Sequence, residues 1–132
     1  MLQYMLDTNI CIYIMRNQYP HLQETFVAER GRICISSITL GELQYGAEKS
    51  ANRARSLDAL RSFLSRLPTL AFDAAAAVDL GALRAELERE GTPCGPYDTQ
   101  IGAHARSAGL TVVTTNQREF DRMPGLRVEN WV

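Results

Sequence analysis

Short apolar runs alternate with longer helical patterns along the chain, and this alternation limits the possible folds more than any other feature. The strand-like runs are 2–6, 33–35, 70–72, 110–114 and 126–128. Between them, apolar residues recur at helical spacing, most clearly over 53–67 and after Asp73. Short apolar strands that alternate with helices are typical of βαβ units, in which helices cover both faces of a parallel sheet. The pattern predicts an α/β fold, a three-layer α/β/α sandwich with a small, mainly parallel sheet.

The length and composition predict a single soluble domain that spans residues 1–132. Apolar residues make up 45% of the chain and charged residues 22%, which is typical of a globular protein. No apolar run approaches the roughly 20 residues needed to cross a bilayer, and the first residues lack the basic start of a signal peptide. Cys11, Cys34 and Cys94 are odd in number and far apart, which favours reduced thiols. We therefore expect a cytoplasmic protein without membrane association.

The net charge of −1 does not indicate a nucleic-acid binder, but the basic residues are almost all arginines. Lys49 is the only lysine among 14 basic residues, and the others are arginines, which contact phosphate oxygens in a planar, bidentate way. Two interpretations of the arginines at positions 53, 55, 61 and 66 stay open. They either follow an RNA backbone or form an ordinary exposed helix face.

Three acidic residues occupy related places in the predicted fold. Asp7 directly follows the first strand, Glu42 lies in the first turn of the helix after the second, and Asp98 opens a later helix. In open α/β sheets, ligands bind outside the carboxyl ends of the strands, where the strand order reverses. We therefore expect these distant residues to meet in one crevice.

Carboxylates gathered in one crevice repel one another unless a cation lies between them. At about 5 Å and an effective dielectric near 20, each pair costs roughly 3 kcal/mol. Hard oxygen ligands favour Mg²⁺ or Mn²⁺ over zinc. Such an ion activates water and neutralises charge on a phosphodiester. The residue types therefore suit metal-dependent phosphodiester hydrolysis without an essential histidine.

Each candidate also has a purely structural interpretation. Asp7 and Asp98 are suitable helix caps, and the segment from Thr39 to Glu42 matches a capping box. His104 is a tempting general base, but it shares a predicted helix face with Tyr97 and small apolar residues, which indicates a packed histidine. His21 lies in a polar helical stretch and is expected to face solvent.

A family resemblance rests on four blocks in order along the chain: MLDTNICIYIM, ISSITLGELQYGAEKS, GPYDTQIGAHARS and VVTTNQREF. They resemble the signature blocks of PIN-domain proteins and, more closely, of VapC toxins from bacterial type II toxin–antitoxin systems. The similarity covers essentially the whole chain, through the terminal LRVENWV.

The resemblance implies a PIN-like fold and a Mg²⁺-dependent endoribonuclease. It places metal-binding carboxylates on Asp7 and Asp98, with Glu42 as the third acidic member. Thr8 and Asn9 would support the first motif, and Thr115 would lie near the metal or the phosphate. The blocks are most similar to those of the enterobacterial group that cuts initiator tRNA in its anticodon stem-loop.

The resemblance also implies protein partners. A cognate VapB antitoxin would cover the active site with its C-terminal segment, and toxin homodimers and larger toxin–antitoxin assemblies would form. Tyr45, Phe63 and Leu64 would line a groove for the antitoxin, although core packing explains them equally well.

One position departs from the family pattern. Many PIN domains carry a fourth acidic residue where this chain has Asn116, and Glu119 follows three residues later. Asn116 forms hydrogen bonds but brings no negative charge. Either Glu119 turns inward to complete the catalytic set, or the site works with three carboxylates.

Two other functions can be judged from the residues that each of them would require. A haloacid-dehalogenase-like phosphohydrolase would need an aspartate at position 9, which is Asn9, and a better-placed lysine than Lys49. A non-catalytic PIN scaffold fits the missing fourth acid but not the three retained ones.

Overall fold

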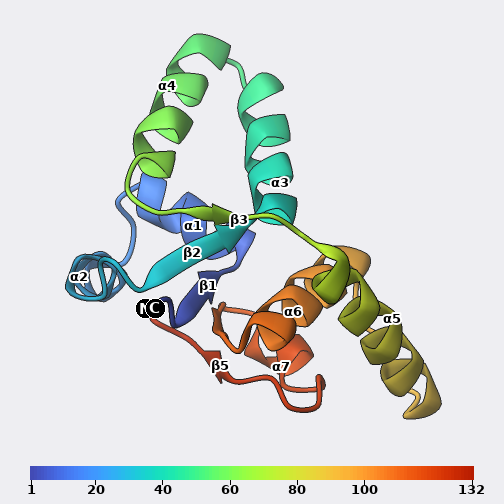
Figure 1. Ribbon diagram of the computed structural model, residues 1–132. Helices are drawn as coiled ribbons and strands as arrows, with labels where there is room; N and C mark the ends of the chain where they lie inside the picture. Colours follow the sequence, from blue (N-terminus) through green and yellow to red (C-terminus); the bar gives the residue numbers. More distant parts are fainter.

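The computed structural model describes all 132 residues and is built on one parallel sheet (Figure 1). Five strands pair in the order β3-β2-β1-β4-β5, and every pairing is parallel. The strands are β1 (Tyr4–Leu6), β2 (Ile33–Ser36), β3 (Thr69–Leu70), β4 (Thr111–Val113) and β5 (Val128–Glu129). This architecture confirms the predicted α/β fold.

Seven helices cover the two faces of the sheet. They are α1 (Thr8–Met15), α2 (Pro20–Ala28), α3 (Ser37–Glu48), α4 (Arg53–Leu64), α5 (Ala74–Arg89), α6 (Pro96–Ala108) and α7 (Gln117–Phe120). Helices α1 to α4 enclose one buried cluster, and α5 to α7 enclose the other. None of these helices combines the length and apolar character needed to cross a membrane.

Alternating side chains of the strands supply both clusters. In β1, Leu6 belongs to the α1–α4 cluster, whereas Met5 belongs to the α5–α6 cluster. In β4, Val113 and Val112 divide in the same way. Since successive residues of a strand point to opposite faces, a continuous apolar run is needed when both faces are covered. The apolar runs of β1 and β4 are therefore continuous because each of these strands contributes side chains to both buried clusters.

Some element boundaries differ from the predictions. The helix expected over 53–67 ends at Leu64, and Pro68 disfavours helical geometry at Leu67, the last residue of the expected helix. The strand expected at 70–72 is Thr69–Leu70, since the Phe72 amide donates to the Ser37 hydroxyl instead of continuing the ladder. The strand expected at 126–128 is Val128–Glu129, and that at 110–114 is Thr111–Val113.

The strand order reverses beside β1, which places a crevice at the carboxyl edge of the sheet. β1 pairs with β2 on one side and with β4 on the other. Asp7 follows β1, and Thr114 follows β4. Figure 1 shows the α3–α4 hairpin projecting beyond this edge, with α6 on the other side of the sheet.

Candidate active site

Two hydrogen bonds hold the Asp7 carboxylate at the carboxyl end of β1, and a third orients one of its partners. Its Oδ1 accepts from the Thr8 amide at 2.8 Å, so the residue does cap α1. Its Oδ2 accepts from the Thr114 hydroxyl at 2.8 Å. That hydroxyl in turn accepts from the backbone amide of Asn116 at 2.9 Å. Only 5% of Asp7 is exposed. Asp7 therefore caps α1 and also presents its carboxylate at the crevice.

Glu42 lies deeper in its helix than the sequence predicts. α3 begins at Ser37, and the Ser36 hydroxyl caps it by accepting from the Ile38 amide at 3.1 Å. The prediction that Glu42 occupies the first turn is therefore wrong, as is the capping box from Thr39, because the helix starts two residues before Thr39. Glu42 instead accepts from the Thr8 hydroxyl at 3.0 Å.

Asp98 is the third residue of α6 and does not cap it, since Gly95 occupies the cap position. Its Oδ2 accepts from the Asn116 side-chain amide at 3.1 Å, and the same amide donates to Glu119 Oε2 at 3.0 Å. The other oxygen of Glu119 accepts from the Gly95 amide. Glu119 therefore turns toward Asp98, and Asn116 bridges the two carboxylates.

The electrostatics of the crevice favour the protonated forms of three carboxyl groups. Burial raises the pKa of Asp7, and the charge of Glu119 raises it further. Burial and the charge of Asp7 likewise raise the pKa of Glu42. Burial, Asp7 and Glu119 together raise the pKa of Asp98 to about 7. The Gly95 amide instead lowers the pKa of Glu119.

No lysine, arginine or histidine forms an ion pair with these four carboxylates. As the side chains lie, no three acidic, histidine or cysteine side chains are close enough to hold one ion, because Thr8 and Asn116 stand between the carboxylates. The donors are nonetheless all hard oxygens, of the kind that Mg²⁺ and Mn²⁺ prefer. The set fits a divalent cation chemically, provided that the bridging bonds yield to it.

Two of the predicted supporting residues lie on the surface. Asn9 is exposed, and its side chain forms no hydrogen bond. Thr115 is also exposed, and the hydroxyl that contacts Asp7 belongs to its neighbour Thr114, which is fully buried. Sequence reasoning missed Thr114, although its place at the end of a buried strand beside Asp7 is the signal that would have found it.

Both histidines lie as predicted. His104 is buried, its Nδ1 lies 2.8 Å from the Ser36 hydroxyl, and burial lowers its pKa. His21 is exposed. Tyr97 does not share the buried face of His104, because 56% of it is exposed beside Asp98.

The three predicted groove residues differ in burial, and the four arginines lie on the surface. Phe63 is fully buried in the core, Leu64 packs partly against it, and Tyr45 is 66% exposed. Arg53 and Arg61 pair with Glu48 and Asp58, whereas the guanidinium of Arg66 lies over Phe26 and Phe63. Arg55 is exposed.

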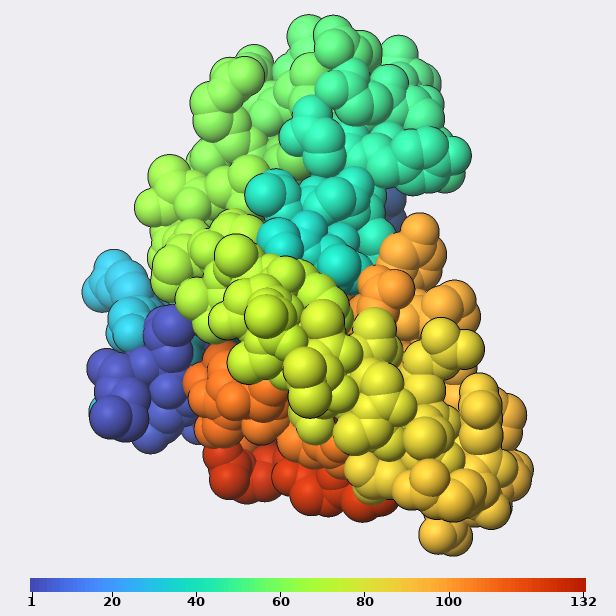
Figure 2. All heavy atoms as spheres, turned by 45° about the vertical axis from the view of Figure 1, so that its right-hand side comes forward, coloured from blue at the N-terminus to red at the C-terminus, as the bar shows by residue number.

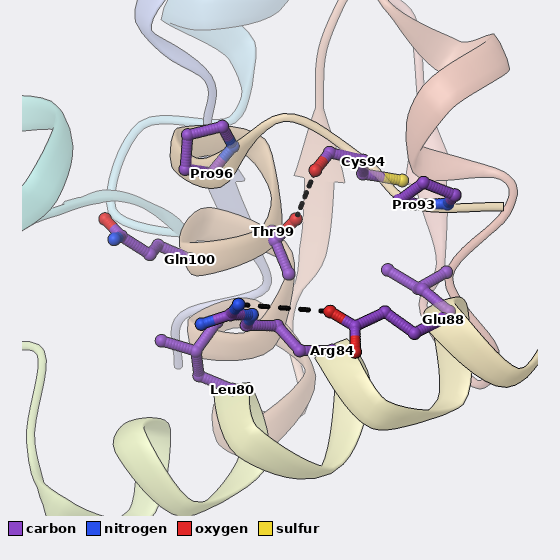
Figure 3. A pocket seen from close by; sticks show the side chains of 9 residues that line it. Leu80, Arg84, Glu88, Pro93, Cys94, Pro96, Thr99 and Gln100 are labelled. Atoms are coloured by element: carbon purple, nitrogen blue, oxygen red, sulfur yellow. Dashed lines mark hydrogen bonds and ion pairs between the residues drawn. The ribbon is translucent and has the colours of Figure 1, made fainter.

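Two grooves lie near the crevice. One has a volume of about 290 Å³ between α1, α3 and α4, and its wall includes Glu42, Arg16 and Gly46. The other, about 280 Å³, lies between α5 and α6 (Figure 3). In Figure 3, Arg84 and Glu88 pair along α5 on one side of this groove, and none of the four carboxylates lines it. Only the first groove leads directly from the carboxylates.

The PIN-domain family model matches residues 4–126 of the chain. The chain belongs to the PIN-domain family. It is 54% identical over 131 residues to the tRNA(fMet)-specific endonuclease VapC of Salmonella typhimurium, and the match covers 99% of each protein. It is 46% identical over 132 residues to ribonuclease VapC2 of Haemophilus influenzae, with all of both chains covered. A crystal structure of DNA-bound VapBC from Salmonella typhimurium holds a chain that matches with a TM-score of 0.96 at 54% identity, over the full length of both.

These relationships confirm the predicted family and enzyme class. The chain is a VapC-type ribonuclease of the PIN-domain family. Nucleases of this family generally depend on a divalent metal. The dehalogenase alternative is wrong, because the family match covers the very blocks on which that alternative depends. The relatives' names also argue against a non-catalytic scaffold.

Proposed function

We propose that the protein is a Mg²⁺-dependent endoribonuclease that cleaves initiator tRNA in its anticodon stem-loop and thereby inhibits translation in the cytoplasm. One observation carries the proposal: the buried Asp7 and the half-buried Glu42 and Asp98 lie at the switch point of the sheet, and no lysine, arginine or histidine forms an ion pair with them. The choice of tRNA is supported by the 54% identity to a relative named for that substrate.

In this proposal Asp7, Glu42 and Asp98 hold the metal, and the other residues position them. When bound, the ion activates water and offsets charge on the scissile phosphate. Thr114 and the Thr8 amide fix the Asp7 carboxylate. The Gly95 amide fixes Glu119 as the fourth acidic member.

Neutral side chains complete the proposed site. Asn116 orients Asp98 and Glu119 through its amide, and the Thr8 hydroxyl orients Glu42. Thr115 is exposed at the same edge, so we assign it to the substrate phosphate and not to the metal. Asn9, also exposed, supports the first motif from the outer side of α1.

The proposed partner is a VapB antitoxin, in homodimeric and larger toxin–antitoxin assemblies. The similar chains of known structure include members of VapBC complexes from Salmonella typhimurium and Rickettsia felis. The groove lined by Glu42, Leu43 and Leu60 suits the antitoxin's C-terminal segment, because it joins an apolar floor to the acidic crevice. A basic antitoxin residue there would form the ion pair that no lysine, arginine or histidine of this chain forms with the carboxylates.

The decisive experiment incubates the antitoxin-free protein with total bacterial RNA and with initiator tRNA, with Mg²⁺ or EDTA, and maps the new ends. Cleavage should need the metal and disappear in Asp7→Ala, Glu42→Ala and Asp98→Ala. Asp58→Ala is the matched control, because this exposed acid pairs only with Arg61. Circular dichroism establishes that each variant is folded. Undiminished cutting by Asp98→Ala would falsify the site, and cutting of other RNAs in preference to tRNA would overturn the substrate.

A further inference from the structure

Tyr45 is an exposed aromatic side chain next to the candidate active site. It lies on α3, three residues beyond Glu42, and 66% of it is exposed. Its hydroxyl forms no hydrogen bond within the protein, and its ring belongs to neither buried cluster. Packing of the chain therefore does not explain why a large aromatic residue stands here.

Lys49 lies over the Tyr45 ring, with its Nζ 4.9 Å from the ring centroid. It is the only lysine of the chain and directly follows the last residue of α3. It forms no ion pair, because the neighbouring Glu48 pairs with Arg53. The positive charge of Lys49 is therefore free to meet a negative charge from outside the protein.

Helical spacing places this pair on the same side of α3 as Glu42. Positions 42, 45 and 49 differ by three and seven residues, which brings their side chains to one face. The helical rise separates Glu42 from Tyr45 by about 5 Å and from Lys49 by about 10 Å along the axis. In Figure 2, a notch separates the teal residues of α3 from the orange residues of α6. The pair thus continues outward from the acidic crevice along one wall.

We propose that Tyr45 and Lys49 form an RNA subsite that holds the substrate beside the scissile phosphate. The ring face that Lys49 leaves open stacks on an unpaired base, and the Lys49 ammonium contacts an adjacent phosphate. Aromatic stacking and a cation along the backbone are the usual elements of single-stranded RNA binding. The inference rests on the proposed ribonuclease function and adds to it the residues that bind a loop of the substrate.

The competing explanation is purely structural. A lysine at a helix C-terminus interacts favourably with the helix dipole, and a tyrosine–lysine pair four residues apart adds a local contact. Both effects would alter thermal stability, but neither would alter the dependence of RNA binding on salt. The test therefore separates binding from stability.

The experiment measures KM and kcat for an anticodon stem-loop RNA in Mg²⁺, and the affinity for the same RNA in an Asp7→Ala background. Tyr45→Ala should raise KM about tenfold with kcat nearly unchanged, whereas Tyr45→Phe should keep the wild-type KM because the ring remains. Lys49→Gln should weaken binding and reduce the salt dependence by about one phosphate contact. Arg89→Gln, an exposed cation near the end of α5 without an ion pair, is the matched control.

Each outcome decides the proposal. Unchanged KM and salt dependence in Tyr45→Ala and Lys49→Gln would overturn it, as would equal effects of Arg89→Gln. Loss of antitoxin binding with unchanged KM would overturn it in favour of a protein-binding surface. If the wild-type protein fails to cut any RNA, the proposed function fails, whereas cleavage by wild type with unaffected variants leaves that function standing and removes only the subsite.

Discussion

Asp79 and Glu86 on α5 share the guanidinium of Arg106, whereas Asp7, Glu42 and Asp98 at the sheet edge share no cation. Arg106 donates to Asp79 at 2.8–3.2 Å and to Glu86 at 3.3 Å, with only 16% of its side chain exposed. At the sheet edge, hydroxyls and an amide stand between the carboxylates instead.

This difference separates a structural cluster from a functional one. The carboxylates raise the pKa of Arg106, as expected of groups that stabilise one another's charge. In the crevice the pKa values of Asp7, Glu42 and Asp98 rise, so each charge there is costly to the folded chain. Uncompensated charge in a cleft is typical of a site that awaits a charged ligand.

The largest effect is expected where the crevice loses a charged ligand. Asp98→Asn should lower the cleavage rate by about a thousandfold and weaken Mg²⁺ binding, since the metal loses a carboxylate. Single-turnover cleavage and calorimetry measure the two effects. Asp58→Asn serves as control because Asp58 is exposed outside the crevice. An Asp98→Asn protein with wild-type metal affinity would contradict the assignment of the crevice as a metal-binding site.

The Arg106 cluster should instead respond in stability. Arg106→Met should lower the free energy of unfolding by about 3 kcal/mol, because Asp79 and Glu86 would keep their charges without a partner. Urea denaturation measures this loss. The double variant Arg106→Met/Asp79→Asn should recover part of it. A loss below about 1 kcal/mol would mean that solvent already neutralises this cluster.

A smaller effect is expected at the hydroxyl that orients Asp7. Thr114→Val keeps the side-chain shape but removes the bond to Asp7 and the acceptor for the Asn116 amide. We expect a loss of about 1–2 kcal/mol in unfolding free energy, together with slower cleavage. Thr115→Val is the matched neighbour and should leave stability unchanged, because Thr115 is exposed. Equal losses in both variants would indicate a general effect of this segment.

The last expected effect is a dependence of stability on pH. Asp98 titrates in the folded protein at about 7, above its ordinary value of 3.8, so the folded state binds more protons than the unfolded state between these values. Metal-free stability should therefore fall as pH rises from about 4 to about 7 and level off above that. Asp98→Asn should reduce this fall, and saturating Mg²⁺ should offset it. Thermal melts across the range measure it, and a metal-free protein that grows more stable toward neutral pH would refute it.

Part of the site follows from local sequence, because local sequence fixes where strands end. The buried run before Asp7 and the helical pattern after it suffice to place this carboxylate at the carboxyl edge of a parallel sheet. The four family blocks likewise suffice for the PIN family. The predicted start of α3 at Thr39 is wrong, because Ser36 and Thr39 are both residue types that cap helices and only the folded backbone shows that Ser36 does so.

The sequence by itself determined the α/β alternation, the family and the strand-end position of Asp7, because side-chain periodicity and local signals act between near neighbours. Only the tertiary structure decided that Thr114 contacts Asp7, that Glu119 turns toward Asp98, and that Arg106 neutralises α5 and not the crevice. The partners Asp7 and Thr114 lie 107 residues apart. Their pairing depends on how β1 and β4 align across the sheet, and periodicity within either segment carries no information about that alignment.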